Sequence, residues 1–137
     1  MVCGRDALTI SILVIKPEWL QMIMDGIKVW EIRKGACLKD GQTIYLVPSE
    51  AAAICARATF VTSHGPLSQD QWIRHSDLHC VHEPNRPYGS DTYGWELRDI
   101  EVAHQPIPIV RKKGAVKWQN VRLSAQIIQA QFEQRAG

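Results

Sequence analysis

The first 34 residues contain two strand patterns separated by a helical pattern, and this order restricts the folds available to the chain. Residues 9–15 are almost continuously apolar and rich in β-branched side chains, which predicts a strand. Pro17 and Glu18 suit the first turn of a helix, because proline needs no N–H there and a carboxylate favours the positive end of the helix dipole. Gly26 suits the end of that helix. We therefore expect strand, helix and strand to follow one another.

The second strand pattern reads G-I-K-V-W-E-I-R-K and carries an unusual number of charges. Trp30 and Ile32 alternate with charged residues, and side chains alternate between the two faces of a strand. We expect these two to pack on one face and Glu31 and Arg33 to lie side by side on the other. Lys28 precedes the strand, where its long stem can reach the charged face. The alternatives are a binding site and a surface salt bridge worth about 0–1 kcal/mol.

Strand patterns dominate the rest of the sequence. We expect strands over residues 43–47, 54–62 and 93–102, a proline-kinked segment over 105–110 and a closing helix over 123–135. Residues 63–92 are irregular, and Ser68 with Gln71 predicts a capping box that starts a short helix. Strands that outnumber helices predict an α+β fold, a small mixed β-barrel of about five to six strands flanked by helices.

Length and hydropathy favour one soluble domain. A chain of 137 residues is most simply a single domain covering residues 1–137. Its longest apolar run, residues 7–15, is far shorter than the roughly 20 residues needed to cross a bilayer. The run also lacks the small-residue cleavage pattern of a signal peptide. We expect a cytoplasmic protein that has no membrane partner.

The cysteine and histidine residues do not form a typical metal-binding pattern. The four cysteines, Cys3, Cys37, Cys55 and Cys80, are far apart and form no C-x-x-C pair, so we expect reduced thiols. The conceivable zinc ligands are His75, His79, Cys80 and His82. Zinc sites usually combine two ligand pairs separated by a longer loop, and this cluster has no distant second pair. We predict neither a metal nor a cofactor.

Positive charge is concentrated late in the chain. Residues 1–101 contain ten Lys and Arg against thirteen Asp and Glu, whereas residues 102–132 contain no acidic residue. The positive residues of this second segment are Arg111, Lys112, Lys113, Lys117 and Arg122. Such a cluster beside an aromatic residue, Trp118, is typical of contacts with an anionic polymer such as nucleic acid. The alternative is a solvated loop before the closing helix.

The segment Ile15–Arg33, I-K-P-E-W-L-x-x-I-x-x-G-x-K-V-W-E-I-R, resembles the opening signature of ASCH domains, which are relatives of the PUA fold. Later stretches are similar to other strands of phage and bacterial members: I-Y-L-V-P-S (44–49), Y-G-W-E-L (93–97), P-I-P-I (106–109) and G-A-V-K-W-Q-N-V (114–121). The resemblance covers residues 8–122, before the closing helix. It implies one ASCH domain, a small β-barrel with the G-x-K-x-x-E-x-R residues at the mouth of a cleft.

This resemblance implies that the charged residues of the second strand serve a nucleic-acid ligand. Arg33 offers a planar fork for a phosphate or a base edge, and Lys28 and Lys16 offer positive charges for phosphates. Glu31 can accept a hydrogen bond from an exocyclic amine, and Trp118 either stacks on a base or belongs to the core. The predicted binding residues are Lys16, Lys28, Glu31, Arg33, Lys112, Lys113, Lys117 and Trp118. The expected partner is RNA, another single-stranded nucleic acid or a nucleotide-like ligand.

Two other function classes are open. Some small bacterial ASCH proteins are amidohydrolases that deacylate acetylcytidine with a threonine nucleophile activated by the motif lysine, and ribonuclease activity is ascribed to others. Glu31 stands at the threonine position here, so an enzyme would use Lys28 and Glu31 as an acid–base pair, with the pKa of Lys28 lowered by burial. The third class is a protein-interaction module that presents an exposed Trp72 and the His-rich region 63–92 to an unknown partner.

Overall fold

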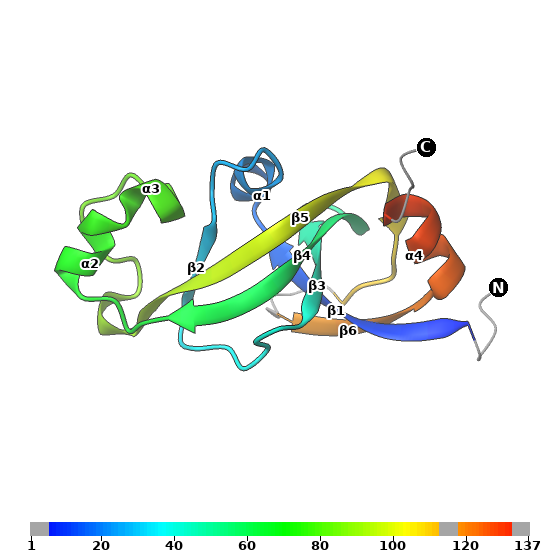
Figure 1. Ribbon diagram of the computed structural model, residues 1–137, viewed down its shortest axis with the longest axis horizontal. Helices are drawn as coiled ribbons and strands as arrows, with labels where there is room; N and C mark the ends of the chain where they lie inside the picture. The colour runs from blue at the N-terminus through cyan, green and yellow to red at the C-terminus, as the bar shows by residue number, and fades with distance from the viewer. Residues whose placement is uncertain (1–5, 113–117, 133–137) are drawn as a thin grey trace. The chain divides into compact units, whose positions relative to one another are not determined.

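The computed structural model describes residues 6–112 and 118–132, which form six strands and four α-helices (Figure 1). The elements are β1 Ala7–Ile15, α1 Pro17–Met24, β2 Trp30–Lys34, β3 Thr43–Pro48, β4 Ala53–His64, α2 Gln69–Arg74, α3 Ser76–His79, β5 Thr92–Pro108, β6 Trp118–Ser124 and α4 Ala125–Phe132, with a short 3-10 helix at Gly89–Asp91. The strand order is β2-β5-β4-β3-β1-β6. The predicted strand–helix–strand beginning is confirmed as β1, α1 and β2.

The chain divides into two compact units, each assembled from separate stretches of sequence. Unit 1 contains Met1–Leu20, Thr43–Ala58 and Glu101–Gly137, and unit 2 contains Gln21–Gln42 and Thr59–Ile100. The long strands β4 and β5 contribute residues to both units. The single domain expected from the chain length stays a prediction.

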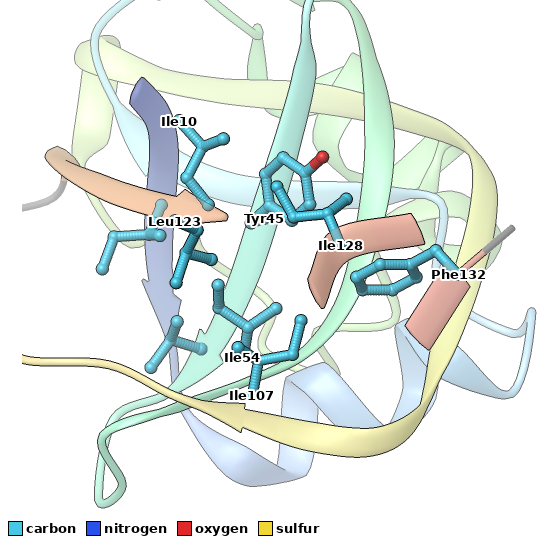
Figure 2. Close-up of a cluster of buried hydrophobic side chains, with 9 residues drawn as sticks. Ile10, Tyr45, Ile54, Ile107, Leu123, Ile128 and Phe132 are labelled. Atoms are coloured by element: carbon cyan, nitrogen blue, oxygen red, sulfur yellow. The ribbon is translucent and has the colours of Figure 1, made fainter. Parts of the chain in front are cut away.

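Unit 1 is organised around β1, which pairs in parallel with β3 and antiparallel with β6. Figure 2 shows its core, where apolar side chains of these strands meet those of β4, β5 and α4. The buried members are Ile10, Ile12, Tyr45, Val47, Ile54, Ile107, Leu123, Ile128 and Phe132. Tyr45 and Phe132 meet edge to face with their ring centroids 5.8 Å apart. The last helix is therefore held on the unit by its apolar stripe.

The start of the closing helix differs from the sequence prediction. The sequence predicts a helix over residues 123–135, but α4 begins at Ala125, because the two residues before it still pair with Leu8 and Ala7 of β1. Ser124 acts as a cap, since its Oγ accepts a hydrogen bond of 3.2 Å from the backbone N–H of Gln126. Residues 133–135 of the predicted helix lie outside the described residues.

The predicted end of the strand at residue 102, before a separate segment over 105–110, is wrong, because one strand, β5, runs from Thr92 to Pro108. β2 pairs with residues 92–96 of this strand, and the described structure pairs no other strand with that side of β5. A proline beyond residue 96 therefore need not remove a ladder hydrogen bond. The backbone N–H of Gln105 donates instead to a side-chain oxygen of α4. Ile107, between two prolines, is buried and keeps the strand end on the core.

Unit 2 contains the antiparallel pair of β2 and β5, with Ile32 opposite Gly94. The indole of Trp30 lies against Gly94, where an added Cβ atom would come within 2.3 Å of the indole Cε3. Trp30 also stacks on His64 of β4, with 4.6 Å between ring centroids. One cluster of buried apolar side chains in this unit consists of Trp30, Ile32, Leu67 and Trp72. A glycine at position 94 is therefore required for this indole to pack on β5.

The irregular region contains the predicted capping box and one wrong prediction. Gln71 donates its backbone N–H to Ser68 Oγ at 3.1 Å, and Ser68 donates its own to Gln71 Oε1 at 2.8 Å, so α2 starts as expected. The predicted exposure of Trp72 is wrong, because this side chain is 1% exposed. Its Nε1 donates to the carbonyl oxygen of Glu83 at 2.9 Å. Trp72 is thus a core residue and offers no surface to a partner.

Candidate functional site

The charged residues of the second strand form one cluster in unit 2. Arg33 Nε donates to Glu31 Oε2 at 2.9 Å, and Lys28 Nζ lies 4.0 Å from Glu31 Oε1. The prediction that Glu31 and Arg33 lie side by side is confirmed, and so is the prediction that the Lys28 side chain extends toward them. The cluster is not open to solvent, however, since Lys28 and Glu31 are only 2% and 4% exposed. Both faces of β2 are therefore covered.

A tight turn after α1 brings Lys28 to this position. Gly26 has a φ of +77°, a left-handed conformation that favours glycine, and it follows the end of the helix. The backbone N–H groups of Ile27 and Lys28 then both donate to the carbonyl oxygen of Met22. From there Lys28 Nζ donates to the backbone carbonyl of His79, at the end of α3, over 2.5 Å. The lysine thus links the start of β2 to a helix 51 residues later.

Burial has a direct electrostatic consequence for Lys28. Removal of the ammonium group from water lowers the pKa of Lys28 below its ordinary value, and the nearby Arg33 adds to this effect. Glu31 and Cys80 act in the opposite direction and favour the charged form, but they do not outweigh burial. The cluster therefore contains an amine that gives up its proton more readily than a surface lysine does.

The predicted binding role of the cluster stays a prediction. Both carboxylate oxygens of Glu31 face a positive side chain, and Lys28 is bonded to a backbone carbonyl. A ligand would reach Lys28 only after a local rearrangement, because the lysine is almost completely covered.

The histidines of unit 2 do not form a zinc site. His79 Nε2 lies 2.8 Å from the carbonyl oxygen of Trp72, and Nδ1 accepts a hydrogen bond of 3.0 Å from Val81 N. Burial lowers the pKa of His79, the backbone carbonyl of Trp72 opposes this, and nearby positive charge at Lys28 adds to the lowering. The ring is therefore a neutral core group. Within residues 6–112 and 118–132, no three His, Cys, Asp or Glu side chains form a group able to hold a metal ion.

The predicted basic residues border a groove in unit 1. One pocket of about 580 Å³ is lined by Val110, Arg111, Lys112, Trp118, Gln119 and Asn120. A second pocket of about 520 Å³ shares Val110 and Asn120 with the first and adds Pro108, Ile109, Val121, Arg122 and Leu123. We call the two pockets together the β6 groove. It follows β6, which is the last strand in the sheet order and has one edge free of strands in the described structure.

Side-chain contacts hold the wall of the β6 groove in place. Lys112 N donates to Gln119 Oε1 at 2.9 Å, and Gln119 Nε2 donates to the carbonyl oxygen of Lys112 at 3.2 Å. Arg111 Nη2 donates to the carbonyl oxygen of Ser49 at 2.6 Å. Trp118 pairs with Leu13 of β1 and is half-buried, so its indole is neither fully in the core nor fully exposed.

The structure places the predicted binding residues in different groups. Lys28, Glu31 and Arg33 meet in unit 2, whereas Lys112 and Trp118 meet in unit 1. Lys16 is an exposed residue of unit 1 whose carbonyl oxygen accepts the first hydrogen bonds of α1. Lys113 and Lys117 lie outside the described residues.

Sequence reasoning missed several groove residues. Arg111, Arg122, Gln119 and Asn120 line the β6 groove but were not predicted as binding residues. The signal was available for the two arginines, because both belong to the acid-free segment 102–132. No comparable signal marks the two amides, whose position depends on the pairing of β6 with β1.

Comparison with known proteins identifies the fold. No protein-family model matches the chain, and no curated protein matches its sequence. The crystal structure of ASCH from Zymomonas mobilis superposes with a TM-score of 0.67 at 15% identity, covering 88% of this chain and 91% of that one. The chain has the ASCH-domain fold.

Two variants of the same Zymomonas mobilis protein agree with this result. Its serine-to-alanine mutant gives a TM-score of 0.65 at 16% identity over 80% of this chain and 85% of that chain. Its tyrosine-to-phenylalanine mutant gives a TM-score of 0.60 at 20% identity, covering 72% of this chain and 74% of that one. The α+β class and the PUA-like fold expected from the sequence are confirmed. At such identities the ASCH likeness concerns the fold and transfers no residue role.

The helices give one further result. None of the helices in the described ranges, 6–112 and 118–132, is long and apolar enough to cross a membrane.

Proposed function

We propose that this ASCH-fold chain binds single-stranded nucleic acid, RNA in particular, through the β6 groove. The observation that carries the proposal is the convergence of three cationic side chains and an indole on one groove. These residues are Arg111, Lys112, Arg122 and Trp118. Grooves that bind single strands combine positive charge along the backbone path with aromatic faces on which bases stack.

Different residue types of the groove are suited to contact different parts of a nucleic acid. Arg111 and Arg122 provide planar forks that can contact a phosphate through two N–H groups, and Lys112 provides a point charge. Trp118 offers a stacking surface that accepts any base. Asn120, an exposed residue in the middle of β6, carries an amide suited to a base edge. At about 3.3 Å per residue, the strand from Trp118 to Leu123 extends on the order of 20 Å.

The cluster of Lys28, Glu31 and Arg33 is proposed as a second contact region for a modified or single nucleotide. The support is the motif resemblance and the guanidinium of Arg33, the most exposed of the cluster's three charged side chains. Because Lys28 and Glu31 are buried, contact with them requires a local rearrangement. This region would select the base rather than supply most of the affinity, since phosphate contacts position and base contacts specify.

The β6 groove can be tested by fluorescence anisotropy with a labelled single-stranded RNA at roughly 50 and 200 mM salt. Lys112→Ala should weaken binding of all sequences alike and reduce the salt slope by about 0.7, as expected for one lost phosphate contact on a single strand. Trp118→Ala should lose about 1–3 kcal/mol of binding free energy with little change in that slope, and Trp118→Phe should lose less.

The matched control is Arg74→Ala, which removes one positive charge from an exposed residue of unit 2. It should leave RNA binding unchanged. An equal loss in Arg74→Ala and Lys112→Ala would mean that only net charge matters. Absence of salt-sensitive binding by the unmodified protein at low salt would refute the proposed function.

A second candidate function is hydrolysis of a nucleoside or of RNA. The observation in its favour is the buried Lys28, whose pKa is lowered and whose Nζ lies 4.0 Å from Glu31 Oε1. An amine whose pKa is lowered can act as a general base at a lower pH than an exposed lysine can. Incubation with acetylcytidine and with labelled RNA, followed by chromatography, tests this function. Product that forms with the unmodified protein and disappears in folded Lys28→Met would support it, and no product from either substrate would exclude both reactions.

A further inference from the structure

Unit 2 contains a pocket of about 480 Å³ that neither proposed function uses. It lies where the end of β4 approaches α2, and the residues that matter for its chemistry are Trp30, Ser63, His64, Gln71 and His75. We propose that this pocket binds a small oxyanion, such as a phosphate group, and that mildly acidic conditions fill it. We call it the histidine pocket.

One indole holds both imidazoles at the histidine pocket. His64 stacks on Trp30 with 4.6 Å between centroids and 14° between planes. The ring centroid of His75 lies 5.0 Å from that of the same indole, with an angle of 47° between the ring planes. Trp30 is itself buried and packed against Gly94, so it is a fixed support. The two histidines therefore keep defined positions at the pocket before any ligand binds, which reduces the entropic cost of binding.

The polar groups that remain at the pocket are mostly nitrogen atoms. His64 Nε2 is bonded to Glu96 Oε1 at 2.9 Å, and Gln71 Oε1 accepts the capping hydrogen bond from Ser68. The hydroxyl of Ser63 contacts the backbone of Cys37 through both its donor and its acceptor. Within the described structure, His64 Nδ1, both ring nitrogens of His75 and Gln71 Nε2 have no such partner. A ligand rich in acceptor oxygens satisfies these groups best.

Glu96 contacts His64, but its own negative charge is already balanced by Arg98. Burial raises the pKa of Glu96, but hydrogen bonds from His64 and Arg98 outweigh it and lower the pKa below its ordinary value. Glu96 is therefore ionised, and its charge is balanced by Arg98, whose Nε lies 2.6 Å from Oε2. A positively charged His64 ring would lie face to face with the indole of Trp30, which attracts a cation.

The surrounding elements carry nearly balanced charge within unit 2. Besides Glu31 and Arg33, their charged residues there are Lys34 on β2, Glu96, Arg98 and Asp99 on β5, Asp70 and Arg74 on α2 and Asp77 on α3, three positive and four negative. Glu31 and Arg33 alternate with Trp30 and so belong to the other face of β2. Protonation of His64 and His75 therefore makes the pocket positive. Imidazoles in general change charge between about pH 5 and 8, which predicts anion binding on the acidic side.

Titration with inorganic phosphate at about pH 5.5 and about pH 8, monitored by the NMR signals of the histidine rings, tests the proposal. Binding should be saturable at the lower pH and at least about tenfold weaker at the higher pH, as expected for the loss of a charge-assisted hydrogen bond. His75→Gln should lose about tenfold at the lower pH. Gln71→Glu keeps the capping oxygen but replaces the donor by a negative charge, so it should abolish binding.

Control measurements separate the source of the anion and the role of the pocket. His104→Gln changes an exposed histidine of unit 1 and should bind phosphate normally. Adenosine monophosphate should bind like phosphate and adenosine should not. Equal affinity at the two pH values, equal loss in His104→Gln, or binding of adenosine would overturn the proposal. Because the probes are small and the variants lie in unit 2, this result is independent of RNA binding at the β6 groove.

Discussion

Replacement of Lys28 tests whether the charged cluster of β2 is buried as the structure places it. The sequence puts Lys28 at an exposed strand entrance, where Lys28→Ala would cost on the order of 1 kcal/mol or less. With the residue only 2% exposed, the same change empties a core position and leaves Glu31 with Arg33 alone. We expect a loss of about 3 kcal/mol in the free energy of unfolding. Lys28→Met keeps most of the volume and should cost about 1–2 kcal/mol.

The pH dependence of this loss carries a definite sign. The pKa of Lys28 is lower in the folded protein than its ordinary 10.5, so between the two values the unfolded chain binds a proton that the folded chain has released. Stability therefore rises with pH across this window, by at most about 1.4 kcal/mol per pH unit. Methionine does not titrate. The stability of the unmodified protein relative to Lys28→Met should consequently increase as the pH is raised toward 10.5.

Urea unfolding monitored by tryptophan fluorescence measures both the loss in unfolding free energy and its dependence on pH. A reductant protects the free thiols. Unfolding curves of the unmodified protein, Lys28→Ala and Lys28→Met are compared at several alkaline pH values. A stability difference between the unmodified protein and Lys28→Met that stays flat or falls with pH would show that burial does not control this lysine. A cost below about 1 kcal/mol for Lys28→Ala would show that the side chain is at the surface.

Two further changes test other parts of unit 2. Gly94→Ala should destabilise the protein by about 2–3 kcal/mol in urea unfolding, because the new Cβ would meet Trp30. In a Trp30→Ala background the same change should cost little. An equal cost in both backgrounds would contradict the packing of Trp30 on Gly94. Glu96 has a lowered folded pKa, so the stability that it contributes is present above its unfolded pKa and is lost as the pH falls through the folded one. Glu96→Gln should therefore make acid unfolding less steep, and an unchanged acid profile would argue against the hydrogen bonds from His64 and Arg98.

Local sequence signals were sufficient for the elements whose cause is local. The helix α1 begins at Pro17, and the left-handed Gly26 follows its end, because both positions depend on backbone conformation within a few residues. The capping box of Ser68 and Gln71 likewise needs only its own four residues. The alternation in β2 was enough to place Glu31 beside Arg33. The motif resemblance was enough to predict the ASCH-type fold.

The tertiary structure decided which of these residues meet water, because burial depends on segments far apart in the sequence. Lys28 is covered where it bonds the carbonyl of His79, and Trp72 is covered by the same helical region. The start of α4 at Ala125 depends on the pairing of β6 with β1, more than a hundred residues earlier. The histidine pocket brings together β2, β4 and α2. The sequence gives the number of charged residues, but it does not give how far each charge is removed from water. The residues packed around Lys28 determine its desolvation and therefore lower its pKa.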